Sequence, residues 1–158
     1  MKLIRADNEM FVFHLDRREK DLLAEVLRRY PLVPASSDRH RMSIQAVLNA
    51  EPQRLLELAL AAQREEHQRQ VRAMLNEPGR FKEADAGFDL ILSPANMEWL
   101  LQVLNDVRVG SWIALGSPNT EKGDAIALNA RNAPHVWLME TAGYFEMQLL
   151  EAMGEKPF

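Results

Sequence analysis

Residues 88–104 read FDLILSPANMEWLLQVL and pass from the period of a strand to the period of a helix. The first five residues alternate between the two faces of an extended chain, with apolar side chains on one of them. Ser93 is a favoured helix N-cap, and Pro94 suits the first helical position. We therefore predict a strand near 88–92 and a helix over residues 94–115.

A second stretch repeats this pattern 77 residues earlier: residues 11–27 read FVFHLDRREKDLLAEVL and share five identical residues with 88–104 at that offset. Asp16 takes the cap position of Ser93, and Glu19 is placed to complete a capping box. Two explanations stay open. Either any strand–cap–helix unit resembles another, or the chain contains a duplicated unit whose two strands lie in one sheet.

The remaining elements are a hairpin and two further helices. Residues 2–15 alternate on either side of a tight-turn sequence, which predicts an N-terminal hairpin. A helix is expected from about 52 to 76. Its apolar half, LLELALAA at 55–62, should be buried, whereas its polar half, REEHQRQ at 64–70, should project into water. A last helix is expected over 134–153.

These elements predict one domain, residues 1–158, of mainly α (α+β) class. We expect about four helices arranged as a bundle. A small antiparallel sheet should be formed by the N-terminal hairpin and the strand near 88–92. Residues 77–87 are rich in turn-forming types, so they are expected to be a plain connection.

Composition narrows the classes of function. The net charge is −4, the pI is about 5.6 and 27% of residues are charged, so nucleic acid is an unlikely partner. The chain contains no Cys, which excludes disulfides and thiolate chemistry. Charges within the first nine residues and the lack of a long apolar run favour a cytoplasmic protein without a membrane span.

Established catalytic and cofactor motifs are missing from the sequence. It has no phosphate-binding glycine loop, no dinucleotide fingerprint, no zinc-protease motif and no nucleophile elbow. The four His residues lack the helical spacing to carboxylates that metal sites use. We therefore expect no catalytic residue, no metal and no cofactor.

The predicted third helix carries polar residues where apolar ones dominate. On a helical wheel Arg108 falls among the apolar residues of a stripe about 60° wide, while Asp106 points to the opposite side. A buried guanidinium needs a carboxylate or several carbonyls, and Glu146 lies on an apolar side of the last helix. We predict that Arg108 meets Glu146, or else a cluster of backbone carbonyls, between the two helices. An alternative is that Asn105, Asp106, Arg108 and Glu146 line a binding pocket.

The stretch LSPANMEWLLQVLNDVRVGSWIALG, residues 92–116, resembles the signature of an uncharacterised bacterial family. That family, mainly actinobacterial, is a domain of unknown function often encoded beside the Clp protease adaptor ClpS. Residues 144–153 are similar to its last helix. Ala95 and Asn96 replace its acidic pair, and the middle of the chain departs from the pattern. The resemblance implies a small cytoplasmic accessory protein with no established activity.

Together these observations favour a non-enzymatic interaction or regulatory module in the bacterial cytoplasm. The alternative is a small-ligand-binding protein or enzyme with a pocket around Arg108 and Glu146. A protein partner is expected, without an indication of its identity. The third helix is apolar on several sides, and a homodimer is one way to cover it.

Overall fold

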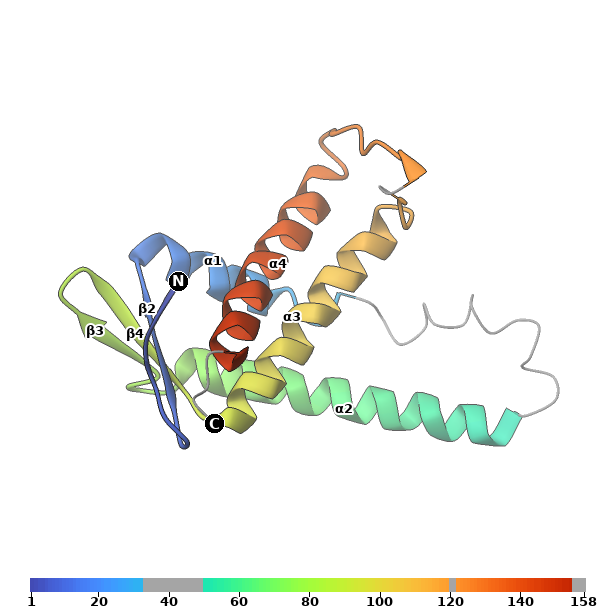
Figure 1. The fold of residues 1–158 in the computed structure, drawn as a ribbon. Helices are drawn as coiled ribbons and strands as arrows, with labels where there is room; N and C mark the ends of the chain where they lie inside the picture. Colours follow the sequence, from blue (N-terminus) through green and yellow to red (C-terminus); the bar gives the residue numbers. More distant parts are fainter. Residues whose placement is uncertain (33–49, 120–121, 155–158) are drawn as a thin grey trace.

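The computed structural model describes residues 1–32, 50–119 and 122–154 (Figure 1). Within these residues it contains four helices and one small sheet, which confirms the predicted mainly α, α+β architecture. The elements in chain order are β1 (Lys2–Ala6), β2 (Phe11–Leu15), α1 (Arg17–Arg28), α2 (Ala50–Asn76), β3 (Phe81–Ala84), β4 (Gly87–Leu92), α3 (Pro94–Ala114) and α4 (Ala133–Gly154).

The sheet is antiparallel throughout, with strand order β1-β2-β4-β3. The prediction of a plain connection at 77–87 is wrong, because it contains β3, which forms a hairpin with β4. The strand is short and mostly polar, so its own sequence gives a weak signal. Pairing with β4, whose alternation is clear, brings it into the sheet.

The two strands of the internal repeat, β2 and β4, lie side by side in the centre of this sheet. Phe13 is paired with Leu90, and Phe11 with Leu92. The order hairpin, helix, helix occurs twice along the chain. In the sheet the first strand of each hairpin lies at an edge and the second strand lies in the centre. The duplication hypothesis requires the two strands to lie in one sheet, and they do. The duplication itself stays a prediction.

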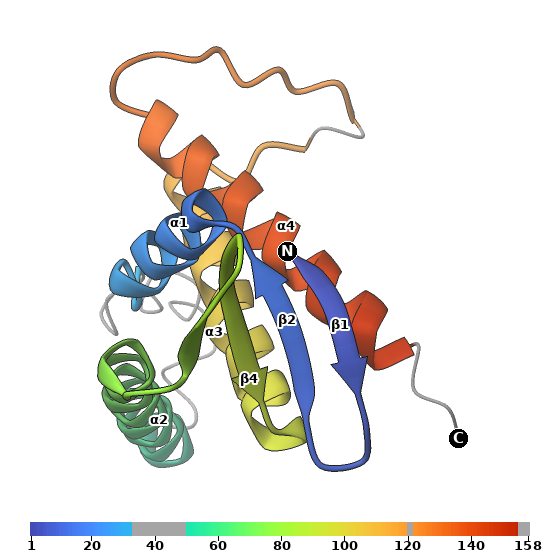
Figure 2. The same ribbon diagram turned by 90° about the vertical axis from the view of Figure 1, so that its left-hand side faces the viewer.

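One face of the inner strands forms the core. Phe11, Phe13 and Leu15 of β2 are buried together with Leu90 and Leu92 of β4, whereas the residues between them are partly exposed. In Figure 2 the sheet faces the viewer, with α3 and α4 behind it. The apolar side chains that recur every second residue in the strands and about every fourth residue in the helices therefore pack together in one layer between the sheet and the helices.

Both predicted caps are present at the strand-to-helix junctions. The Asp16 carboxylate accepts from the Glu19 backbone N–H, and the Ser93 hydroxyl accepts from that of Asn96. Side chains at Glu19 and Asn96 reach back to complete two capping boxes. A cap of this type stabilises a helix by about 1 kcal/mol, and here it also sets the angle at which strand and helix meet.

Helix α2 differs from the prediction in which half it buries. Its buried residues, His67, Val71 and Met74, all lie in the C-terminal half. The N-terminal half extends away from the sheet and the other helices (Figure 1). The predicted burial of residues 55–62 is therefore wrong. The predicted projection of 64–70 into water holds for Glu65, Arg69 and Gln70, which are exposed, and is wrong for His67, which is buried.

Candidate functional site

The four candidate residues of the sequence divide between two sides of α3. Arg108 and Glu146 form an ion pair, with Nε and Oε2 2.7 Å apart, which joins α3 to α4 as predicted. Arg108 also donates through Nη2 to the Asn105 side-chain oxygen at 3.2 Å. Asp106 faces away from this pair and lines a separate pocket with α1 and α2.

The predicted burial of Arg108 is wrong. Its side chain is 48% exposed, whereas that of Glu146 is 11% exposed. The reason is that Leu104, Val107 and Ser111 occupy the buried contact, one step around the helix from Arg108. Burial raises the pKa of the Glu146 carboxyl, and the Arg108 guanidinium opposes that rise. The pair is therefore a half-exposed clamp that neutralises a buried carboxylate.

Beside this clamp lies a hollow of about 450 Å³. Its lining is largely apolar and comes almost entirely from α4, with residues Arg108, Met139, Glu140, Gly143, Tyr144 and Met147. The Arg108 guanidinium is already engaged by Glu146 and Asn105. A ligand in this hollow would therefore contact mainly an open surface formed by Met139, Tyr144 and Met147.

The pocket that holds Asp106 is more polar and lies between α1, α2 and α3. It has a volume of about 250 Å³ and is lined by Tyr30, Leu60, Gln63, Arg64, His67, Gln102, Asn105 and Asp106. The Tyr30 hydroxyl lies 3.4 Å from Nδ1 of His67, and the two rings are tilted against each other. Gln63 donates to the Gln102 side-chain oxygen across the pocket at 3.5 Å.

The pKa values of two side chains in this pocket, Asp106 and Tyr30, are higher than those of the free side chains. Burial raises the pKa of the Asp106 carboxyl, against the opposing effects of Arg64 and His67. Burial and the nearby Asp106 carboxylate raise the pKa of Tyr30 to about 12. The Tyr30 hydroxyl lies between the Asp106 carboxyl, with which it hydrogen-bonds, and the His67 imidazole. This is the most chemically organised cluster in the described residues.

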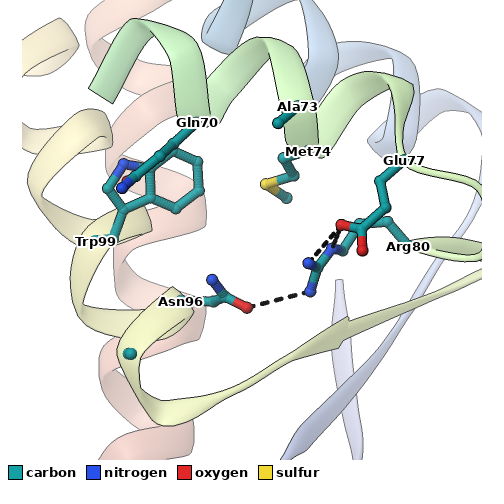
Figure 3. Close-up of a pocket in the computed structure, with 8 residues that line it drawn as sticks. Gln70, Ala73, Met74, Glu77, Arg80, Asn96 and Trp99 are labelled. Carbon is teal, nitrogen blue, oxygen red and sulfur yellow. Dashed lines mark hydrogen bonds and ion pairs between the residues drawn. The ribbon is translucent and has the colours of Figure 1, made fainter. Parts of the chain in front are cut away.

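A third pocket lies where the C-terminal end of α2 meets the start of α3 (Figure 3). It has a volume of about 310 Å³, and Trp99, Met74 and Ala73 provide its apolar lining. Arg80 closes one end. Its guanidinium contacts the Glu77 carboxylate, donates to the Ile91 carbonyl at 2.9 Å and donates to Asn96 Oδ1 at 3.1 Å.

Arg80 therefore joins three elements at one point. It ties the end of α2 through Glu77, the strand β4 through Ile91, and the capping box of α3 through Asn96. Its side chain is only 21% exposed. The indole nitrogen of Trp99 is buried and has no hydrogen-bond partner among the described residues. We assign this pocket a structural role.

Sequence reasoning missed Tyr30, His67 and Arg80. The spacing of four and three residues between His67, Val71 and Met74 is typical of a buried helix stripe, so His67 could have been found from the sequence. Tyr30 continues the apolar stripe of the first helix at the same spacings, so its burial was predictable although its contact with His67 was not, whereas Arg80 carries no comparable signal. Each follows the end of a helix, and its partners come from distant parts of the chain.

Other classes of site are not found in the part of the chain that the structure describes. There, no three His, Asp or Glu side chains are grouped as a metal site would require. Among the same residues, no helix is both long and apolar enough to cross a bilayer. Comparison with protein-family models, with curated proteins and with solved structures finds no match for this chain.

Proposed function

We propose that the chain is a non-catalytic protein-interaction module whose binding element is the N-terminal half of α2. The observation that carries this proposal is the exposure of three neighbouring leucines. Leu55 is 60% exposed, Leu56 53% and Leu58 57%. Leu60 and the alanines around it extend the same apolar segment along the helix.

Exposure on this scale has an energetic cost that a partner would remove. Burying a leucine side chain fully is worth about 1.5–3 kcal/mol, so three half-exposed leucines leave several kcal/mol available for binding. Contiguous apolar surface on a soluble protein typically marks an interaction site. A helix apolar on all sides is typical of a buried segment, yet within the described residues no element covers this half.

The family resemblance agrees with this proposal. The family that residues 92–116 and 144–153 resemble implies a small accessory protein of the bacterial cytoplasm without an established activity. The α3 positions that carry the resemblance support the body of the molecule. The apolar half of α2 lies outside the resembling segments, so we assign partner choice to this chain's own sequence.

The test compares two exposed apolar surfaces of the same chain. Leu55→Gln combined with Leu58→Gln should leave the free energy of unfolding unchanged or slightly raised, because both side chains are already exposed. The control is Leu150→Gln on α4, whose leucine is 58% exposed. Each protein is used as bait in its source cell, and captured proteins are quantified by mass spectrometry.

The expected result is that wild type and Leu150→Gln capture the same proteins, while the double variant loses at least one of them. Self-association of all three baits is measured alongside by sedimentation. A double variant that keeps every captured protein and the wild-type sedimentation behaviour would contradict the proposal.

A second candidate function is small-ligand binding, and the pocket of Tyr30, His67 and Asp106 favours it. Its polar lining suits a small neutral molecule with several hydrogen-bonding groups. The alternative centred on Arg108 and Glu146 is less favoured, because those charges already satisfy each other. A ligand that raises the melting temperature of the wild type but not of Asp106→Asn would support the second candidate.

A further inference from the structure

The polar pocket between α1, α2 and α3 lies where the covered half of α2 ends. On its C-terminal side His67 of α2 is buried, whereas Leu60 on its N-terminal side is exposed. The opposite wall is formed by side chains of α3 that remain accessible to solvent, among them Asn105 and Asp106. A small molecule can therefore enter the pocket and contact both helices at once.

The base of the pocket is built from buried side chains. Tyr30 is 3% exposed and His67 is 9% exposed, and the hydroxyl of the first lies 3.4 Å from Nδ1 of the second. The Tyr30 hydroxyl also hydrogen-bonds with the Asp106 carboxyl. These contacts hold the carboxylate in one place. A group that the protein already holds loses little conformational entropy when a ligand binds to it.

The pocket contains charges of both signs on opposite walls. Asp106 lies on α3, and Arg64 lies on α2. Partial burial raises the pKa of the Asp106 carboxyl, and the charge of Arg64 opposes this rise. A further positive charge beside the carboxylate would therefore be favourable. A ligand with one charge would be attracted by one of the two side chains and repelled by the other, whereas a ligand with both charges would be attracted by both.

Side-chain amides form the rest of the polar lining. Gln63 donates to Gln102 at 3.5 Å, which is at the long limit of a hydrogen bond, so the contact is weak. The side-chain oxygen of Asn105 accepts from Arg108, and the NH₂ group of Asn105 is not used in that contact. An amide offers a donor and an acceptor side by side without a charge. These groups suit an uncharged polar substituent on the ligand.

The size of the pocket limits the ligand to few atoms. Its volume of about 250 Å³ corresponds to about eight water molecules of about 30 Å³ each. The free amino acids serine, asparagine and glutamine contain a similar number of non-hydrogen atoms. A nucleotide or a peptide is several times larger and would extend far outside the pocket.

We infer that this pocket binds a free α-amino acid with an uncharged polar side chain, with the ammonium group at Asp106 and the carboxylate group at Arg64. The ligand would then bridge α3 and α2, and its side chain would contact the amides of Gln63 and Gln102. The inference deepens the second candidate function, small-ligand binding at this pocket, and rests on it. It does not depend on the exposed leucines of α2.

Calorimetric titration of the whole chain with L-serine, L-asparagine and L-glutamine tests the inference. At least one of them should bind with a dissociation constant below about 5 mM. The amino acid that binds most tightly is then compared with two analogues, one without the ammonium group and one without the carboxylate group. For glutamine these are glutaramate and γ-aminobutyramide. Each analogue should bind at least about tenfold more weakly, and equal binding of either one would overturn the inference.

Two charge-removing variants locate the site. Arg64→Gln and Asp106→Asn should each weaken binding at least about tenfold, because each leaves one end of the ligand without its partner. The matched controls are Arg69→Gln on α2 and Glu98→Gln on α3, which remove exposed charges outside this pocket. Both controls should bind within about threefold of wild type. Equal weakening by pocket and control variants would contradict the assigned site.

Circular dichroism checks that each variant is folded. If a pocket variant does not fold, the comparison of the analogues on the wild-type chain decides the question alone.

The inference and the second candidate function fail in different ways. If none of the three amino acids binds at about 10 mM, the amino-acid inference is wrong. The second candidate then still stands if another small molecule from a metabolite library raises the melting temperature of the wild type but not of Asp106→Asn. If no molecule of the library does so, both are wrong.

Discussion

Replacing Arg80 by Ala is expected to lower stability by more than its position in a turn suggests. The substitution removes charge-assisted hydrogen bonds to the Ile91 carbonyl at 2.9 Å and to Asn96 Oδ1 at 3.1 Å. It also removes the ion pair with Glu77, whose side chain is half-exposed. The junction of α2, β4 and α3 would lose its shared contact.

The expected loss of stability depends on how exposed Arg80 and its partners are. The two bonds of a largely buried guanidinium contribute about 1 kcal/mol each, and the exposed ion pair adds about 0–1 kcal/mol. Arg80→Ala should therefore lower the free energy of unfolding by about 2–3 kcal/mol. For a chain of this length that corresponds to a fall in melting temperature of roughly 5–10 °C.

Urea denaturation followed by circular dichroism measures this change, with two comparison variants. Glu77→Gln removes the ion pair alone and should cost less than about 1 kcal/mol. Arg5→Ala removes an arginine that is 67% exposed and pairs with Asp7, so it should cost at most about 0.5 kcal/mol. If Arg80→Ala were no more destabilising than Arg5→Ala, the assigned role of Arg80 would be refuted.

Three further outcomes are expected from the clamp, the polar pocket and two glycines. Glu146 has a raised pKa in the folded state, so the free energy of unfolding falls as the pH rises from about 4 through that pKa. Arg108→Met removes the opposing positive charge, so it should raise the pKa of Glu146 further and make this fall steeper. Urea denaturation between about pH 4 and pH 8 measures both effects. Asp106 also has a raised pKa, so Asp106→Asn should gain stability relative to wild type as pH rises over the same range, and a constant difference would contradict the raised pKa. Gly143→Ala should stabilise α4 by about 0.5–1 kcal/mol, because the added Cβ meets only Arg108 Cδ at 3.6 Å. Gly87→Ala should cost at least about 2 kcal/mol, because its Cβ would lie 2.1 Å from the Leu15 carbonyl oxygen, and equal melting temperatures for the two alanine variants would refute this contrast.

The strand–cap–helix units were predictable because their signals are local. Alternation in β2 and β4, the caps at Asp16 and Ser93, and the proline at position 94 act over a few residues. Each can be read from the sequence without knowing what packs against it. The antiparallel sheet followed from these units, apart from β3, whose own pattern is too short to read.

The candidate site was predictable only in part. The wheel positions placed Arg108 toward α4 and Asp106 away from it, and the ion pair with Glu146 is present. The exposure of Arg108 depends on how far α4 extends over α3. A helical wheel describes one helix and does not show how another helix packs on it. The contacts of Tyr30 with His67 join residues 37 positions apart, so they follow from the packing of α1 against α2.

Helix α2 shows most clearly which features the sequence determines and which features depend on the tertiary structure. Sequence by itself indicates that residues 50–76 are helical and that residues 55–62 are apolar apart from Glu57. Tertiary structure alone decides which half is covered. Val71 and Met74 pack against the body because Arg80 holds the C-terminal end of α2 to β4 and α3, through Glu77, Ile91 and Asn96. A helix is rigid, so fixing one end directs the other away from the core, and its leucines remain exposed however apolar they are.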